Sequence, residues 1–174
     1  TAPPIPPSTI SEPPELTLAE PIVDYDETLK AASHAYFSGD TDGAMEHFSA
    51  AIKAHPHESE AYITRGTIYQ ERGNWRAALD DYEMAREHNP NDFAAWNNIA
   101  MLLAACPEDS IRDGDKAADY ALKACKLSEW ENPAVVNTLA IAYAEQGEWK
   151  YAVDHANLAI NDASIREGNE ALIE

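Results

Sequence analysis

The residues of this chain best suited to metal chemistry lie close together along the sequence: His55, His57, Glu58 and Glu60. Imidazole and carboxylate groups are common ligands of divalent cations. A metal site also needs surrounding groups that orient its ligands, and a turn beside Pro56 offers none that the sequence identifies. We therefore interpret these residues as solvated surface and expect no metal and no other cofactor.

The chain has two cysteines, Cys106 and Cys125. We expect them on two antiparallel helices, one at the end of the first and the other near the far end of the second. That arrangement places them too far apart for a disulfide. Two separate cysteines also lack the short spacings of a Cys/His metal site, so we predict two buried, free thiols.

Sequence motifs of catalysis are missing as well. The chain has no glycine-rich phosphate loop, no nucleophile elbow and no carboxylate pair beyond those of ordinary helix surfaces. Its six histidines are scattered rather than grouped with a nucleophile. We therefore predict a noncatalytic protein.

The formal net charge of -19 restricts the partners. Recognition of nucleic acid needs a basic face against the phosphate backbone, so we expect no nucleic-acid partner, and the same reasoning disfavours anionic lipid surfaces. A basic or neutral protein or peptide would be favoured on encounter. Solubility alone is another sufficient reason for such a charge.

The elements that carry these residues are defined by an internal repeat. Small residues recur at one phase as Ala32, Gly66, Ala100 and Ala140, at spacings of 34, 34 and 40 residues. Two further columns consist entirely of alanine, at positions 44, 78, 117 and 152 and at positions 51, 85, 124 and 159. Helices cross closely only where the side chains at the crossing are small. The columns therefore mark a helix crossing that recurs four times.

Turn residues divide each unit into two helices. Apolar residues within the units follow helical periodicity. Gly39, Gly73 and Gly147 stand where a first helix must end and the chain must reverse, because glycine tolerates the left-handed conformation. Pro56 and Pro90 stand where a second helix must end, because proline cannot donate the next intrahelical hydrogen bond.

This pattern resembles the tetratricopeptide repeat, a helix–turn–helix of 34 residues with bulky, small and aromatic residues at fixed offsets. The second unit carries that signature as Tyr62, Gly66, Tyr69, Ala78, Tyr82, Ala85 and Pro90, with Arg65 where an apolar residue is usual. The resemblance implies an all-α fold, a right-handed α–α superhelix over residues 25–164. Its four helix–turn–helix repeats would cover about residues 25–58, 59–92, 93–132 and 133–164.

The third unit departs most from the pattern. Ala100 and Ala117 are 17 residues apart where the other units use 12, so five extra residues lie in its internal turn, within residues 106–114. Two interpretations remain open for this insertion. It is either a simple lengthened turn or a loop that contacts a partner.

The two ends of the chain differ from the repeats. Seven of the eleven prolines lie in residues 1–24, a composition that favours an extended linker. Such a spacer would suit an exported or membrane-anchored protein, and a cytoplasmic location is the alternative. A proline-rich ligand for an SH3-like or WW-like partner is a weaker interpretation. Residues 165–174 are expected to be a tail or a partial cap on the last unit.

In the family that the chain resembles, the first helices line a concave groove, exposed at positions 2, 5, 6, 9, 12 and 13 of each unit. In the first unit these positions are Asp26, Leu29, Lys30, Ser33, Tyr36 and Phe37, and the second unit begins the same series at Glu60. A subset of the family binds chaperone C-terminal carboxylates through cations in the groove. Here such slots hold Leu29, Ser33, Ile63, Thr64, Thr67, Ala94 and Ala134, so we expect no carboxylate-clamp ligand.

The resemblance therefore implies a groove that binds a protein or peptide segment. The predicted site residues are Tyr36, Phe37, Ile63, Thr67, Gln70, Asn97, Asn98, Met101, Asn137 and Ile141. Asparagine amides can both donate to and accept from a peptide backbone, so Asn97 and Asn137 are expected to hold main chain. Ala104, Ala105 and Ala144 are expected to leave room in the groove.

The last helix suggests an alternative, a structural or self-associating component. Val153, Leu158 and Ile160 are expected on its outer side, where a second subunit would form a homodimer through the C-terminal repeat. Trp75 and Trp149 begin equivalent second helices, so we expect both to be structural.

Overall fold

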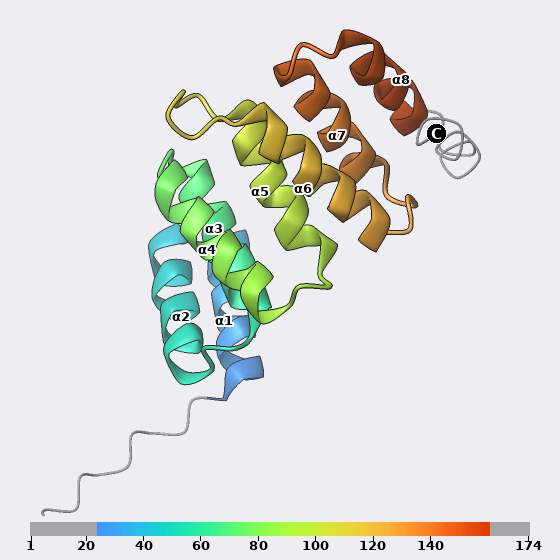
Figure 1. The fold of residues 1–174 in the computed structure, drawn as a ribbon. Helices are drawn as coiled ribbons and strands as arrows, with labels where there is room; N and C mark the ends of the chain where they lie inside the picture. Colours follow the sequence, from blue (N-terminus) through green and yellow to red (C-terminus); the bar gives the residue numbers. More distant parts are fainter. Residues whose placement is uncertain (1–23, 161–174) are drawn as a thin grey trace, which may run out of the picture.

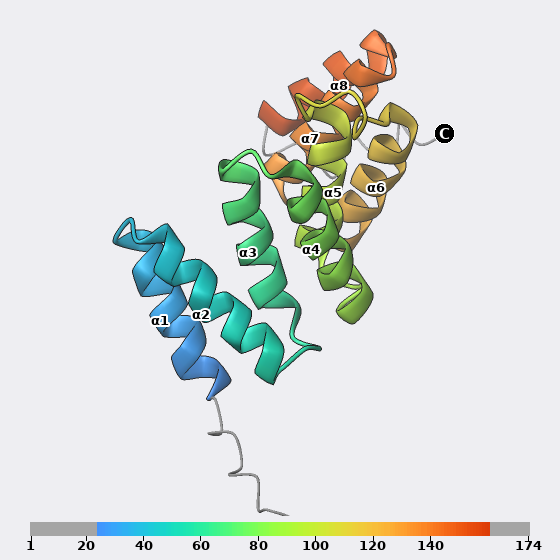
Figure 2. The same ribbon diagram turned by 90° about the vertical axis from the view of Figure 1, so that its left-hand side faces the viewer.

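The computed structural model describes residues 24–160, and in that range the chain forms eight α-helices and no β-strand. The helices are α1 (Tyr25–Phe37), α2 (Thr41–Ala54), α3 (Ser59–Glu71), α4 (Trp75–His88), α5 (Phe93–Ala105), α6 (Gly114–Leu127), α7 (Pro133–Glu145) and α8 (Trp149–Ile160). Successive pairs form antiparallel hairpins, and the four hairpins stack one after another (Figures 1 and 2). The predicted all-α superhelix of four helix–turn–helix repeats is confirmed.

The two ends of the prediction lie beyond this range. Almost all of the predicted linker 1–24, and the whole of the predicted tail 165–174, fall outside the described residues. None of the helices in residues 24–160 is long and apolar enough to cross a bilayer.

The helix boundaries follow from the residues expected to set them. Gly39, Gly73 and Gly147 adopt φ of +87°, +74° and +81° between the two helices of units one, two and four. Helix α2 ends at Ala54, two residues before Pro56. Acidic or amide side chains cap most first turns; Asp40, for example, accepts a hydrogen bond from the Gly43 N–H at 2.9 Å.

The small-residue columns lie at the helix crossings, where Ala32, Ala44 and Ala78 are fully buried. Gly66 shows how tight these crossings are. A Cβ atom at this position would lie 2.7 Å from Cε1 of Tyr82 on the facing helix α4. The Tyr82 ring thus occupies the space that any side chain at residue 66 would need.

The buried apolar residues form two main clusters rather than one uniform core. The larger cluster runs from α4 to α8 and includes Ile99, Leu139 and Val136. The smaller cluster joins α1 and α2 to the face of α3 that packs against the first unit, and it includes Phe48 and Ile68. A small group of Tyr62, Ala85 and Ala95 connects α3, α4 and α5.

An ion pair between a partly buried arginine and a buried aspartate joins α3 to α4. Arg65 on α3 donates to both carboxylate oxygens of Asp81 on α4, at 2.8 and 2.7 Å, and also donates to Ser49 on α2 at 3.1 Å. The hydrogen bond to Asp81 is the main reason that the pKa of Arg65 is raised. Arg65, the departure from the repeat signature, therefore links three helices with hydrogen bonds where an apolar residue would only pack.

The insertion of the third unit is an ordered turn between α5 and α6. Ile111 is buried, and the Asp113 N–H donates to the Leu103 carbonyl at 2.8 Å. Arg112 donates to the Cys106 carbonyl at 2.8 Å, to Glu145 at the end of α7 at 3.0 Å, and to Asp109. The extra residues are thus attached to the fourth unit as well as to their own.

Trp130 lies in the middle of the connection from α6 to α7 and, like Glu129 before it, has a left-handed conformation, with φ of 60°. A bulky residue rarely adopts this conformation unless its surroundings hold it there. The indole is partly buried against the larger core and stacks on His155 of α8, with 6.5 Å between ring centroids. The Trp130 side chain therefore packs between the third and fourth units.

Replacement of Gly66 by alanine tests the helix crossing. We expect Gly66→Ala to lower the free energy of unfolding by about 2 kcal/mol, because overpacking costs more than the ~1 kcal/mol that alanine gains in a helix. Urea denaturation measures the change. In a Tyr82→Ala background the same substitution should not destabilise the protein, and an equal loss in both backgrounds would contradict the contact.

Candidate functional site

An open surface cavity of about 320 Å³ lies along α1, with one lining residue from the next first helix, α3. Its lining residues are Asp26, Leu29, Lys30, Ser33 and Glu60. We call it the α1–α3 cavity. All five are groove positions of the repeat pattern, but none belongs to the ten predicted site residues, which favoured amides and large apolar groups. The repeat positions themselves were the signal that could have identified them.

A hydrogen bond links α1 and α3 beyond this cavity. The Tyr36 hydroxyl donates to the Glu71 carboxylate at 2.6 Å, and this bond is the main cause that raises the Tyr36 pKa. Phe37, the next residue, is 84% exposed and lies 5.6 Å from the Tyr36 ring between centroids. The predicted aromatic pair therefore lies at the C-terminal end of α1. Tyr36 is hydrogen-bonded to Glu71, and Phe37 is exposed to solvent.

The predicted residues of α3 serve the helix crossing. The buried Tyr82 hydroxyl donates to Gln70 at 3.0 Å, and it also lies 3.3 Å from the Thr67 hydroxyl in a weaker contact. Burial raises the pKa of Tyr82 to about 12. Thr67 and Gln70 are half-buried and already bonded to the fold, whereas the half-buried Ile63 packs against the small cluster of Tyr62, Ala85 and Ala95.

The predicted residues of α5 are all half-buried: Asn97, Asn98 and Met101. The amide oxygen of Asn97 is buried and has no hydrogen-bond partner among residues 24–160. An unpaired buried acceptor costs about 1–3 kcal/mol. Asn97 is therefore the groove amide that would gain most from a donor, once its side chain turns toward one.

Helix α7 places one amide in solvent and one apolar residue at the edge of the core. Asn137 is exposed, and the half-buried Ile141 packs against the larger cluster. Helices α5 and α7 also pack directly on each other. Thr138 and Ala104 are buried, so the expectation that Ala104 leaves room in the groove is wrong, while Ala105 is exposed.

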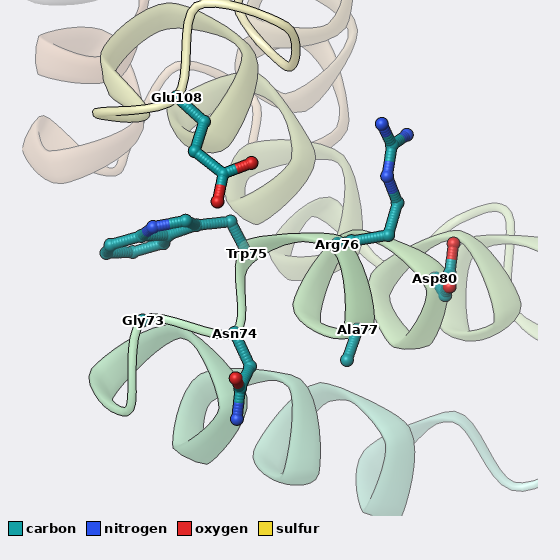
Figure 3. A pocket seen from close by; sticks show the side chains of 7 residues that line it. All are labelled: Gly73, Asn74, Trp75, Arg76, Ala77, Asp80 and Glu108. Atoms are coloured by element: carbon teal, nitrogen blue, oxygen red, sulfur yellow. The ribbon is translucent and has the colours of Figure 1, made fainter.

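A second cavity, of about 420 Å³, lies at the edge of the array, where the turn between α3 and α4 meets the insertion of the third unit. We call it the turn cavity. Figure 3 shows Glu108 of the insertion reaching toward the indole of Trp75, with Arg76 and Asp80 farther along α4. Gly73, Asn74 and Ala77 complete its lining. This cavity is made by the insertion and by the second unit together.

The last helix exposes an apolar face. Trp149 is 68% exposed, Val153 58% and Ile160 79%, and their spacing along α8 places them on one side of the helix. Leu158, in contrast, packs against the larger core. The expectation that Leu158 faces outward is therefore wrong, and so is the expectation that Trp149 is a structural residue like Trp75.

The thiols are placed as expected. Cys106 and Cys125 are both buried and free. Burial raises the pKa of Cys125 to about 12, so this thiol is protonated at neutral pH. No group of three or more histidine, cysteine, aspartate or glutamate residues within 24–160 is arranged to hold a metal ion.

A family model described as the tetratricopeptide repeat matches residues 59–92. Those residues are the second unit, which carries the signature with the one departure at Arg65 and contains α3 and α4. The match therefore coincides with the hairpin in which Gly66 and Tyr82 are in contact.

Two curated proteins that are similar to this chain are named for the same repeat. A tetratricopeptide repeat and J domain-containing co-chaperone, DNJ1, of Cryptococcus neoformans is 27% identical over 146 residues, which cover 77% of this chain and 27% of that protein. DNJ1 of Fusarium oxysporum is 28% identical and covers 78% of this chain and 26% of that protein. The chain thus spans about a quarter of the length of these relatives.

Solved structures share the fold. A crystal structure of MamA superimposes with a TM-score of 0.68 at 19% identity, covering 81% of this chain and 79% of that chain. MamA from Desulfovibrio magneticus RS-1 gives a TM-score of 0.67 at 18% identity, covering 80% and 76%. These structures are α–α superhelices of the same kind as the described residues of this chain.

Thiol labelling tests the placement of the two cysteines. With a pKa near 12, only about one Cys125 in ten thousand is a thiolate at pH 8, and burial blocks access to both residues. We expect an aromatic disulfide reagent to label neither cysteine of the native protein, and both after denaturation. Ser38→Cys, at an exposed position, provides a thiol that should react at once. Rapid native labelling of the unmodified chain would contradict this placement.

Proposed function

Because this chain belongs to the tetratricopeptide repeat proteins, we propose that it is a noncatalytic module that binds a protein or peptide segment along its first helices. The α1–α3 cavity is the observation that carries this proposal. It is bounded by residues at groove positions 2, 5, 6 and 9 of the first unit and position 2 of the second. At the N-terminal end of the array, the groove positions of the repeat family therefore coincide with the α1–α3 cavity.

The chemistry of this surface favours a segment that is basic or neutral. Asp26 and Glu60 border the α1–α3 cavity, with Lys30 as the cation in its lining. Leu29 offers an apolar contact and Ser33 a hydroxyl that can donate or accept. A negatively charged chain end would meet two carboxylates there, which supports our expectation of no carboxylate-clamp ligand.

Farther along the array the segment would meet amides and apolar side chains. Asn137 is exposed, and the buried amide oxygen of Asn97 lacks a donor within the described range. Ile63, Met101 and Ile141 are half-buried and so retain apolar surface for contact. We propose that Asn97 and Asn137 bond the main chain of the segment while these residues contact its side chains.

The relatives support a protein as the partner class. Two of them are named as co-chaperones. The chain covers only about a quarter of each, so their activity as whole proteins is not carried over. What is carried over is the repeat array and, with it, a surface suited to binding polypeptide.

A peptide-display experiment tests the groove. Twelve-residue random peptides would be selected on the described array, and their affinities measured on variants. Ser33→Arg would fill the α1–α3 cavity with a cation, and Asn97→Ala with Asn137→Ala would remove the amides, so each should weaken binding about tenfold or more. Calorimetry of the synthetic peptides measures the loss.

The matched control is Ala50→Arg, which adds the same cation at an exposed position of α2. This variant should bind the selected peptides as the unmodified chain does, and all variants should keep the same melting temperature within about 3 °C. Selected peptides that bind Ser33→Arg and the amide double variant with unchanged affinity would refute the groove.

The exposed face of α8 favours a second candidate function, a self-associating assembly component. Trp149, Val153 and Ile160 present large apolar side chains to solvent, and such patches mark interaction sites in soluble proteins. A two-fold axis beside α8 would bury this face against its own copy, as an isologous dimer interface does.

Sedimentation velocity tests this second candidate. If α8 forms the interface, the full chain should sediment as a dimer at about 100 μM and dissociate on dilution. Val153→Lys should give a monomer, because a cation would be buried at the interface, whereas Lys123→Glu at an exposed position of α6 should leave the dimer intact. A monomer at every concentration would exclude self-association through this face.

A further inference from the structure

The geometry of the turn cavity points to a second binding site, one that takes an arginine side chain from a protein partner. The site combines a partly buried indole, Trp75, with the carboxylates of Glu108 and Asp80. It lies at the edge of the array and shares no residue with the α1–α3 cavity. The two sites can therefore succeed or fail independently.

The insertion holds Glu108 in place on this side of the molecule. The Glu108 carbonyl accepts from the Ile111 N–H at 3.0 Å, and Ile111 is buried. Arg112 anchors the other side of the turn to Cys106 and Glu145. The backbone at Glu108 is therefore fixed before any ligand arrives, which reduces the entropic cost of binding to the ordering of the Glu108 side chain.

The charges that line the cavity are not neutralised by each other. In the part of the chain that the structure describes, neither Glu108 nor Asp80 forms an ion pair, and Arg76 forms none with either of them. Figure 3 shows the guanidinium of Arg76 pointing away from the Trp75 ring. The space between Trp75 and Glu108 thus has a negative charge and an aromatic surface but no cation.

This combination fits a guanidinium better than other groups. A guanidinium is planar, so it can stack on an indole, and it can donate two parallel hydrogen bonds to one carboxylate. A lysine ammonium lacks that planar match. Trp75 itself is partly buried and packs against the larger core. The indole is therefore a firm surface for stacking.

The five extra residues of the third unit explain why this site would be particular to this chain. Glu108 lies within the insertion, whereas Trp75, Arg76 and Asp80 belong to the second unit. The insertion is interpreted either as a simple lengthened turn or as a loop that contacts a partner. Binding of a ligand by Glu108 would favour the second interpretation.

Nuclear magnetic resonance of the indole N–H groups tests the site. The full chain has four tryptophans, and Trp75→Phe identifies the signal of Trp75. Titration with Nα-acetyl-arginine methylamide should shift the Trp75 signal saturably, while the citrulline analogue, of equal shape but neutral, should not. Glu108→Gln should weaken the affinity about threefold or more, as loss of one partly exposed ion pair does.

Two variants separate a local site from general attraction to an acidic protein. Arg76→Gln removes the nearby cation and should strengthen binding about twofold. Glu46→Gln makes the same charge change as Glu108→Gln at an exposed position of α2, and it should leave the affinity unchanged. Equal shifts with arginine and citrulline would overturn the inference. So would equal weakening by Glu46→Gln and Glu108→Gln, with circular dichroism confirming that each variant is folded.

Discussion

The close approach of two helices within each hairpin is the constraint on which the rest of this structure depends. At the second crossing the Tyr82 ring would lie only 2.7 Å from a Cβ of residue 66, so glycine alone fits without a shift of the neighbouring side chain. The same phase in the other units holds alanine. Because the ring is drawn in so far, its hydroxyl is buried and needs acceptors, which Gln70 and Thr67 supply. Two positions of the groove are thereby committed to holding the crossing together.

The array built on this crossing is not uniform along its length. In the last two units α5 and α7 pack directly, with Thr138 and Ala104 buried near their contact. In the first two units the corresponding helices leave the α1–α3 cavity open, and the Tyr36 to Glu71 hydrogen bond links them. The core divides in the same place, and Arg65 with Asp81 joins its parts by hydrogen bonds. Binding surface is therefore available at one end of the array and packing dominates at the other.

Acidic side chains border both cavities, Asp26 and Glu60 in one and Asp80 and Glu108 in the other. Nearby opposite charges are few, since the chain has 12 lysines and arginines against 31 aspartates and glutamates. A basic partner would be attracted to either cavity from a distance and then distinguished by contacts at short range. For that reason the overall charge indicates a basic partner, and the residues that line each cavity determine where that partner binds.

The sequence by itself determined the fold. The small-residue columns describe contacts between neighbouring helices that recur in every unit, so one alignment of the chain with itself reveals them. The turn glycines and the closing prolines mark helix ends. Tyr82 against Gly66 could be anticipated in this way, and so could the two buried, free thiols. Only the tertiary structure decided exposure, because exposure depends on whether a neighbour is present. Trp75 and Trp149 occupy the same repeat position, yet Trp75 has the next unit beside it while Trp149 lies on the last described helix and is 68% exposed. The lining of the turn cavity likewise depends on how far an insertion reaches across to another unit, and no repeat pattern encodes that distance.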